Sequence, residues 1–322
     1  MEYLNNQEGN LDCLFLSIFR NHHHPRSPIK QVDAKFFQAE KIFLSMFKLG
    51  MFEIYEFLYN YCTDDYHFKS WIISLKGELF YKEKVVEFNK WYKSIHEKEA
   101  KPINDFLSAD QHQFWEEKGY LRIEQIIDAE RCDAVIAHIV NELQINLESP
   151  ETWYLSAEKL QGLMLPLYQG LALENIREDE QIKAVFASLY QTYDILPNCE
   201  KVSFNPPVNH HYTFKGSPLH WDIDFSVGPK YHIQGLLYLN DVPINRGPFT
   251  LIPGYQHQIA AVLEEYGNPE LALETLRDSE EIIALAGKKG DLIVWLESLP
   301  HAASPNYSDQ PRFVQYISFH KF

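Results

Sequence analysis

The sequence lacks the features that define several protein classes. Its four cysteines are widely spaced and include no CxxC pair, which argues against a zinc knuckle or a disulfide framework. No apolar run approaches the roughly 18 residues of a membrane span, and the polar, acidic start MEYLNNQEGN is unlike a signal peptide. We therefore expect a soluble cytoplasmic protein with reduced thiols.

Positive charge is also scarce. The 322 residues hold 29 Lys+Arg against 45 Asp+Glu, a formal net charge of −16. Residues 1–105 contain 14 basic and 15 acidic side chains, so the remaining 15 basic and 30 acidic side chains give residues 106–322 a charge of −15. Such a field repels polyanions, and we expect neither nucleic acid nor a membrane as a partner. A content of 45% hydrophobic and 14% aromatic residues predicts a folded chain with a sizeable core.

The N-terminal residues 1–32 are interpreted as a tail. They include the run NHHHPRSP, in which His22, His23 and His24 offer imidazole groups that suit Zn and Ni. Three adjacent side chains in a loop bounded by proline are not expected to converge on one ion. We therefore predict a solvated loop here rather than a metal site.

Residues 33–100 predict a helical domain. Four apolar stripes follow one another at helical spacing, and Gly50, Asp64 with Asp65, and Gly77 separate them as stop or cap signals. This pattern predicts four short antiparallel helices joined by tight turns. The periodicity leaves open whether the domain is a lid, a dimer surface or structural cover.

A second domain is predicted over residues 106–322, after a charged linker at 97–105. Ser108 and Gln111 have the spacing of a capping box, which predicts a helix that ends near Gly119. A strand follows over YLRIEQII, and Asp128 is expected to cap a further helix, whereas residues 150–195 carry no clear pattern. From residue 201 onward, short β-like runs predict an antiparallel sandwich or barrel: KVSF, HIQGLLYL, PFTLIP, DLIVWL and FVQYISF.

The candidate chemistry lies within this β region. His220 and Asp222 in LHWDID are two residues apart, so on a strand both side chains face one way and can meet one divalent metal. Alone, the pair is equally typical of a strand-end histidine with a local hydrogen bond. His301 follows the apolar run DLIVWL and offers a second imidazole. Two histidines and one carboxylate leave three metal positions open, as in non-haem Fe(II) oxygenases, whereas a structural zinc site uses four protein ligands.

Arg312 follows His301 by eleven residues. Its planar guanidinium suits a carboxylate, so an inward-facing arginine near the metal would hold an acidic co-substrate. The alternative is a surface salt bridge.

The ordered set from His220 to Arg312, with RGPFTLIPGYQH between them, resembles the phytanoyl-CoA dioxygenase family of Fe(II)/2-oxoglutarate-dependent oxygenases. The resemblance covers about residues 106–322. One residue more than usual separates Gly254 from His257. The fold that it implies is α+β, with a double-stranded β-helix (jelly-roll) catalytic domain and flanking helices, preceded here by the all-α N-terminal extension.

The resemblance also implies roles for individual residues. It makes His220, Asp222 and His301 the catalytic ligands of Fe(II), and Arg312 the partner of the distal carboxylate of 2-oxoglutarate. Further co-substrate contacts are expected from side chains at positions where family members often have a lysine, an aromatic residue and a small polar residue. The first two positions hold Asn205 and Tyr238. The third holds Ala303, so the contact is expected from Ser304 next to it.

The implied reaction is hydroxylation, or another two-electron oxidation, of a small molecule by O2, with conversion of 2-oxoglutarate to succinate and CO2. The charge of −15 disfavours a CoA thioester and favours a neutral or amine-bearing metabolite. Loop residues between 150 and 215 are expected to line the pocket, namely Trp153, Tyr168, His210, His211 and Tyr212.

Two other functions remain open from the residues. One is a non-catalytic jelly-roll binding protein whose helical unit recruits a partner. The other is a cupin-like enzyme that uses Zn or Mn without 2-oxoglutarate, which Arg312 disfavours. A homo-oligomer formed through the N-terminal helices is a further possibility.

Overall fold

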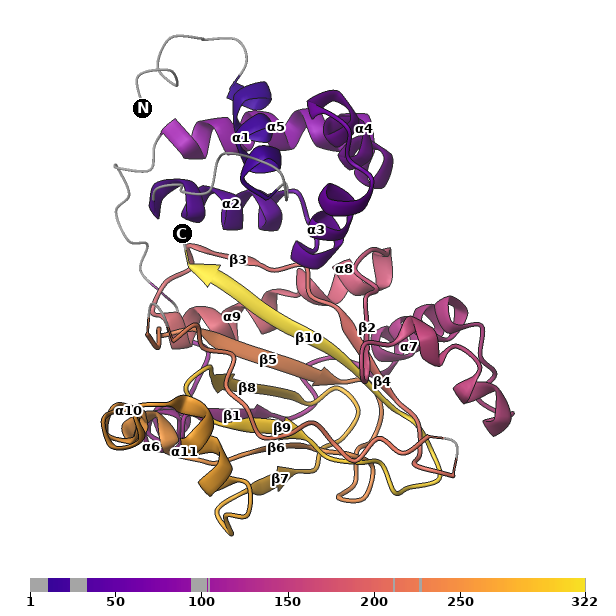
Figure 1. Ribbon diagram of the computed structural model, residues 1–322, viewed down its shortest axis with the longest axis vertical. Helices are drawn as coiled ribbons and strands as arrows, with labels where there is room; N and C mark the ends of the chain where they lie inside the picture. Colours follow the sequence, from indigo (N-terminus) through magenta and orange to yellow (C-terminus); the bar gives the residue numbers. More distant parts are fainter. Residues whose placement is uncertain are drawn as a thin grey trace. The chain divides into compact units, whose positions relative to one another are not determined.

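The computed structural model describes residues 11–23, 34–93, 103, 105–210, 212–225 and 228–321, and its contacts divide the chain into two compact units (Figure 1). The helical unit comprises Met1–Pro102, Thr192–Cys199 and His320–Phe322. The sheet unit comprises Ile103–Gln191 and Glu200–Phe319. Most of the predicted linker, as well as His24 and His211, lies outside the described residues.

The helical unit contains the four helices expected over residues 33–100. Gly50 precedes the second of them as its N-cap, and Asp64 caps the third by accepting a hydrogen bond from His67 N at 2.8 Å. Gly77 ends that helix with a φ of +86°, a conformation that glycine adopts without strain. The four helices are α2 (Ala34–Met46), α3 (Met51–Asn60), α4 (Asp65–Lys76) and α5 (Glu78–Lys93).

The prediction of an unstructured tail is wrong for part of residues 1–32. Helix α1 (Leu11–His23) occupies this segment, and its side chains Phe15, Leu16 and Phe19 are buried in the core of the helical unit. The ring of Phe19 stacks on that of Phe68 at 5.7 Å. His23 continues the same helix face at the spacing i+4 from Phe19, so the expected solvated loop is a half-buried helix end at His22 and His23.

A segment distant in sequence also belongs to the helical unit. Strand β3 (Ile195–Pro197) lies in Thr192–Cys199, and Leu196 packs against the helical core. Asn198 Oδ1 accepts a hydrogen bond from Ser45 Oγ on α2 at 3.1 Å. The core of this unit therefore depends on residues outside the predicted range 33–100.

The sheet unit begins as the sequence predicts. Ser108 caps α6 and accepts a hydrogen bond from Gln111 N, while Gly119 ends the helix in the left-handed conformation. Asp128 caps α7 in the same way. The unit contains α6 (Ala109–Lys118), β1 (Tyr120–Ile123), α7 (Ala129–Leu143), β2 (Met164–Leu165), α8 (Leu171–Arg177), α9 (Glu180–Tyr190), β4 (Val202–Asn205), β5 (Ile233–Tyr238), β6 (Phe249–Leu251), α10 (Ile259–Tyr266), α11 (Pro269–Leu276), β7 (Ile283–Leu285), β8 (Leu292–Leu296), β9 (His301–Ala303) and β10 (Arg312–Lys321). Short 3-10 turns lie at Pro150–Tyr154, Ala157–Lys159 and Tyr255–His257.

Two antiparallel sheets form the framework of the sheet unit. The larger follows the order β1-β8-β5-β10-β4-β2, and the smaller the order β7-β6-β9 (Figure 1). The register places Arg312 opposite Asn205, and Tyr316 opposite Leu236. Because side chains alternate along strands, Gln234, Arg312 and Tyr316 point to one face of the larger sheet, here called the inner face.

The opposite face of the larger sheet is covered by helices. Gln315 Nε2 donates to Leu173 O on α8 at 3.0 Å, and the ring of Phe319 lies 4.7 Å from that of Phe186 on α9. Helix coverage removes this face from water, so a ligand can reach the larger sheet only from the inner face.

The five predicted β-like runs all contain strands, but His220 and Asp222 do not lie on one as expected. His220 forms an isolated antiparallel bridge, and Asp222 lies in irregular backbone. Trp221 between them is buried and donates to Ser298 O at 3.1 Å, as a core residue should.

Two absences apply to the described part of the chain. None of its helices combines the length and the apolar character needed to cross a bilayer. Its cysteines Cys62, Cys132 and Cys199 take part in no disulfide.

Candidate metal and co-substrate site

The backbone brings His220 and His301 together. His220 N donates to His301 O at 3.0 Å, and His301 N donates to His220 O at 2.9 Å. Residues paired in this way project their side chains to the same side, and the two ring centroids are 4.5 Å apart. The backbone pairing with His301 therefore sets the position of His220, although the two residues are far apart in the sequence.

Both imidazoles are held in one tautomer by the backbone two residues earlier. His220 Nδ1 lies 2.8 Å from Pro218 O, and His301 Nδ1 lies 3.0 Å from Leu299 O. A carbonyl oxygen only accepts, so each Nδ1 carries the hydrogen. In such a neutral ring, Nε2 carries a lone pair that is available to a metal.

Asp222 completes a cluster with both Nε2 atoms. Its Oδ2 lies 3.5 Å from His301 Nε2, and its Oδ1 lies 3.9 Å from His220 Nε2. One potential ligand atom from each of the three residues lies within 4.8 Å of the others. The structure thus brings together all three residues that the sequence selected as metal ligands.

Gln234 on β5 orients this carboxylate. Its Nε2 donates to Asp222 Oδ2 at 2.6 Å. Burial would raise the pKa of Asp222, but the neighbouring His301 and the hydrogen bond from Gln234 hold the pKa well below its usual range. The carboxylate is therefore charged at neutral pH, as a ligand for a divalent cation must be.

The surroundings of His220 favour its neutral form. Burial lowers the pKa of His220, and the neighbouring His301 lowers it further. Aromatic side chains surround His301, with ring centroids 5.4 Å away for Trp295 and 5.6 Å for Phe249. This apolar wall limits water on one side of the cluster and strengthens electrostatic interactions within it.

Arg312 is buried at the start of β10 and forms no surface salt bridge. Its exposed fraction is 1%, and no carboxylate of the described residues lies within ion-pair distance of it. One terminal nitrogen donates to Gly247 O, and the other donates to Ser203 Oγ at 3.1 Å. Its Nε is buried without a partner. A buried charge of this kind is costly unless an anion pairs with it.

Arg312 and the metal cluster share the inner face of the larger sheet. Tyr316 lies two positions beyond Val314 on β10. Burial raises its pKa, while the charge of Arg312 lowers the pKa and that of Asp222 raises it. Burial raises the pKa of Tyr212 to about 12, and the charge of Arg312 acts in the opposite direction. Tyr212 and Tyr316 therefore lie within electrostatic range of the guanidinium.

Several buried polar atoms on this face lack a protein partner. They are Arg312 Nε, Asn205 Oδ1, Tyr212 Oη and Gln234 Oε1. Asn205 lies directly opposite Arg312 in the register, and its Nδ2 donates weakly to Ser304 O at 3.4 Å. Buried donors and acceptors are rarely left unsatisfied, so the group points to a polar ligand.

The hydroxyl of Tyr238 makes structural contacts, whereas the contacts of Ser304 come from its backbone. Tyr238 Oη donates to Leu285 O at 2.8 Å and accepts from Phe249 N at 2.9 Å. It thereby joins β5 of the larger sheet to β6 and β7 of the smaller one. Ser304 N donates to Pro248 O at 3.1 Å, and Ser304 O accepts the bond from Asn205.

The remaining expected pocket residues differ in position. Trp153 is buried and donates to Asn146 O at 3.0 Å, Tyr168 is buried, and His210 is exposed. Residues that sequence reasoning missed include Ser203, which is two positions before Asn205 and thus on its face, and Asn306. Asn306 donates to Asn205 O at 2.8 Å and to Gln310 O at 2.9 Å, which orders the loop before Arg312.

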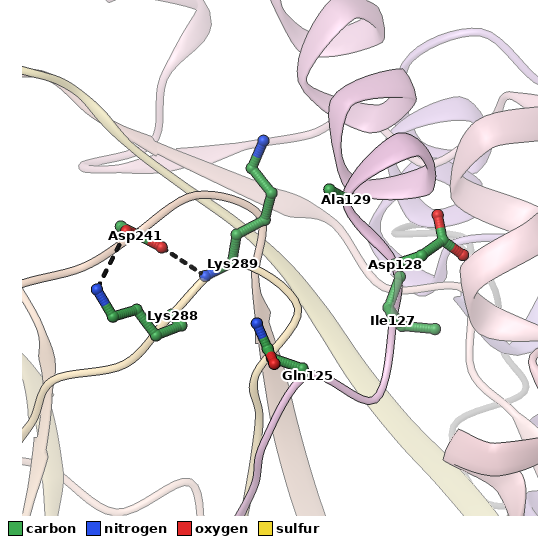
Figure 2. A pocket seen from close by; sticks show the side chains of 7 residues that line it. All are labelled: Gln125, Ile127, Asp128, Ala129, Asp241, Lys288 and Lys289. Atoms are coloured by element: carbon green, nitrogen blue, oxygen red, sulfur yellow. Dashed lines mark hydrogen bonds and ion pairs between the residues drawn. The ribbon is translucent and has the colours of Figure 1, made fainter.

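A separate surface pocket of about 610 Å³ lies away from these residues (Figure 2). Asp241 there accepts hydrogen bonds from Lys289 N and Lys288 Nζ, and Lys289 Nζ pairs with Asp133 at 2.6 Å. Each lysine charge is matched by an aspartate, so the pocket offers no anion site. Its full lining is Gln125, Ile127, Asp128, Ala129, Asp241, Lys288 and Lys289.

The inner-face residues fit Fe(II) and 2-oxoglutarate. Two imidazoles and one charged carboxylate form a 2-His-1-carboxylate set, the donor chemistry of non-haem Fe(II). The buried, unpaired guanidinium of Arg312 matches the free carboxylate of a dicarboxylic acid.

Comparisons with known proteins agree with this chemistry. The family model described as Phytanoyl-CoA dioxygenase (PhyH) matches residues 115–314. A "Putative phytanoyl-CoA dioxygenase" of Dictyostelium discoideum is 21% identical over 64% of this chain and 73% of its own length. An "Ectoine dioxygenase" of Bordetella bronchiseptica is 23% identical over 66% of this chain and 76% of its own.

One similar solved structure is that of SnoK, a non-heme alpha ketoglutarate dependent carbocyclase from nogalamycin biosynthesis. Its TM-score is 0.49 and its sequence identity 14%, over 69% of this chain and 87% of that chain. The family match spans more than half of the present chain and includes His220, Asp222, His301 and Arg312. The chain therefore belongs to the phytanoyl-CoA dioxygenase family of Fe(II)/2-oxoglutarate-dependent oxygenases.

Proposed function

We propose that this oxygenase hydroxylates a neutral or amine-bearing small metabolite at the inner face of the larger sheet. The observation that carries the proposal is the unpaired guanidinium of Arg312 on the same face as the His220, Asp222 and His301 cluster. A non-catalytic binding protein would need neither the charged metal-ligand set nor the buried cation.

In the proposed site, His220, Asp222 and His301 hold Fe(II), and Arg312 holds the distal carboxylate of 2-oxoglutarate. Bound iron and 2-oxoglutarate supply the oxidising power, since O2 converts the co-substrate to succinate and CO2 as the substrate is oxidised. The protein supplies orientation. Pro218 O and Leu299 O fix the two imidazoles, and Gln234 fixes the carboxylate.

Polar side chains around Arg312 have positioning roles in this proposal. Arg312 Nε is a free donor and Asn205 Nδ2 a weakly used one, so both are available to a carboxylate. Tyr212 Oη adds a third polar group. We assign Tyr238 to the support of this site because its hydroxyl joins three strands, and we retain Ser304 as a co-substrate contact.

The charge and the acceptors on the inner face favour a substrate that donates hydrogen bonds. Gln234 Oε1 is buried without a partner while its Nε2 holds Asp222. An N–H or O–H of the substrate would satisfy this acceptor. The acidic balance of residues 106–322 favours a neutral or amine-bearing molecule over a CoA thioester.

The proposal extends to the architecture. We propose that the two antiparallel sheets form the double-stranded β-helix, since Tyr238 and the pairing of His220 with His301 tie them together. We further propose that residues 106–322 and the N-terminal helices are separate domains. The location that we propose is cytoplasmic.

A homo-oligomer formed through the N-terminal helices is part of the same proposal. Leu79 and Val86 lie seven residues apart on one face of α5 and are 73% and 69% exposed. Light scattering of the wild type and of Leu79→Glu tests this, since a common monomer mass for both would contradict it.

The substrate class is tested by incubating the Fe(II)-loaded enzyme with 2-oxoglutarate, O2 and two sets of compounds. One set contains neutral and amine-bearing metabolites, and the other contains CoA thioesters. Mass spectrometry is expected to find a product with one added oxygen atom only in the first set. Oxidation restricted to CoA thioesters would contradict the proposed substrate class while leaving the oxygenase assignment intact.

A further inference from the structure

A second cluster of metal-ligating side chains lies in the helical unit. His22 and His23 form the last turn of α1, and Glu40 lies on α2. One potential ligand atom from each residue lies within 4.8 Å of the other two. We propose that these three side chains bind a divalent transition-metal ion of the Zn²⁺ type, and that the ion joins α1 to α2.

The spacing of the ligands is close to that of a zinc site. His23 Nε2 lies 2.8 Å from Glu40 Oε1. Metal–ligand bonds of about 2.1 Å in a tetrahedron separate two ligands by roughly 3.3 Å. Small rotations of two side chains provide this spacing, and three protein ligands leave the fourth position to water.

Burial and unsatisfied polarity favour an ion over a simple hydrogen bond. The side chains of His23 and Glu40 are only 14% and 6% exposed. His22 Nδ1 is buried without a partner. A divalent cation supplies the positive charge that a buried carboxylate requires and gives the histidine cluster a common partner.

The surroundings hold the ligands in place. The ring of Tyr55 lies 4.4 Å from that of His23, and that of Phe19 lies 5.0 Å from it. Burial raises the pKa of Tyr55 far above its usual range, and the charge of Glu40 raises it further. The phenol thus stays protonated beside the carboxylate, within an otherwise aromatic shell.

The sheet unit offers a matched control. His112 Nε2 lies 2.7 Å from Asp105 Oδ2, so this pair has the same chemistry as His23 and Glu40. Its side chains are 28% and 42% exposed, and the described residues provide no third ligand for it. If a histidine–carboxylate pair alone sufficed for zinc binding, both places would bind it.

The test requires removal of zinc binding at the catalytic cluster. A full-length variant with Asp222→Ala and His301→Ala keeps only one of the three proposed iron ligands and serves as the background. Calorimetric titration of this metal-free variant with ZnCl2 is expected to show one equivalent bound. Adding Glu40→Gln or His23→Ala is expected to weaken binding at least ~10-fold, and adding His112→Ala to leave it unchanged.

Absence of zinc binding by the background variant, or an affinity that Glu40→Gln leaves unchanged, would overturn the proposal. A second measurement avoids variants in the helical core. Zinc is expected to slow modification of His22 and His23 by diethylpyrocarbonate in the wild type, measured by peptide mass spectrometry, without slowing that of His112. Equal rates at His22 and His23 with and without zinc would also count against the site.

Discussion

Replacement of Arg312 by methionine is expected to separate co-substrate binding from stability. A guanidinium has five N–H donors, and those of Arg312 engage Gly247 O and Ser203 Oγ, with Nε unpartnered. Two hydrogen bonds from a charged group to a carboxylate contribute about 1.5–3 kcal/mol each. Arg312→Met is therefore expected to raise the Kd of 2-oxoglutarate by ~10²- to 10⁴-fold.

The stability of the ligand-free protein is expected to change little. Loss of the two existing hydrogen bonds costs about 1.5–3 kcal/mol each, and removal of a buried, unpaired charge offsets this by relieving a desolvation penalty of several kcal/mol. The free energy of unfolding of Arg312→Met without ligand should thus be close to, or above, that of the wild type.

Thermal unfolding with Mn²⁺, with and without 2-oxoglutarate, measures both effects. At 100 times the Kd, the ligand stabilises the wild type by about 2.7 kcal/mol, which corresponds to roughly 5–10 °C in Tm. Arg312→Met should lose this shift. Arg177→Met is the matched control, because Arg177 is also buried with unpartnered nitrogens but lies on α8, and it should keep the shift. An undiminished shift in Arg312→Met would refute the reasoning.

Three further predictions follow from other contacts. Gln234→Leu removes the donor to Asp222 and is expected to raise the Kd of Fe(II) about 10- to 100-fold in an anaerobic titration, so an unchanged Kd would show that Gln234 does not position the ligand. Tyr238→Phe leaves Leu285 O and Phe249 N without their partner. It is expected to lower the free energy of unfolding, measured in urea, by about 1–3 kcal/mol and to change 2-oxoglutarate binding far less. The reverse pattern would make Tyr238 a co-substrate contact. Burial raises the pKa of Cys132 to about 11, which disfavours the thiolate. The rate of Cys132 alkylation by iodoacetamide should therefore keep rising with pH beyond 9, and a plateau near pH 8.5 would contradict this cause.

Local signals in the sequence predicted the helices α2 to α7. Ser108, Asp64 and Asp128 cap helices where their spacing placed them, because a cap depends only on the neighbouring backbone N–H groups. The order of His220, Asp222, His301 and Arg312 likewise sufficed to select the residues that share the inner face.

Features that depend on distant contacts were not predictable. Helix α9 shows no single apolar stripe because its residues from Val185 to Tyr190 are buried on every side. The pairing of His220 with His301 replaces the expected strand at the H-x-D motif. The hydroxyl of Tyr238 is used between two sheets, which no pattern within β5 reveals.

The most direct test of the central claim is succinate formation by anaerobically purified, Fe(II)-loaded protein that receives 2-oxoglutarate and O2. The wild type is compared with Asp222→Ala, both alone and with a metabolite pool. The account predicts succinate from the wild type, increased by the pool, and none above background from Asp222→Ala. Equal succinate from both proteins, or none from a wild type shown to contain iron, would contradict it.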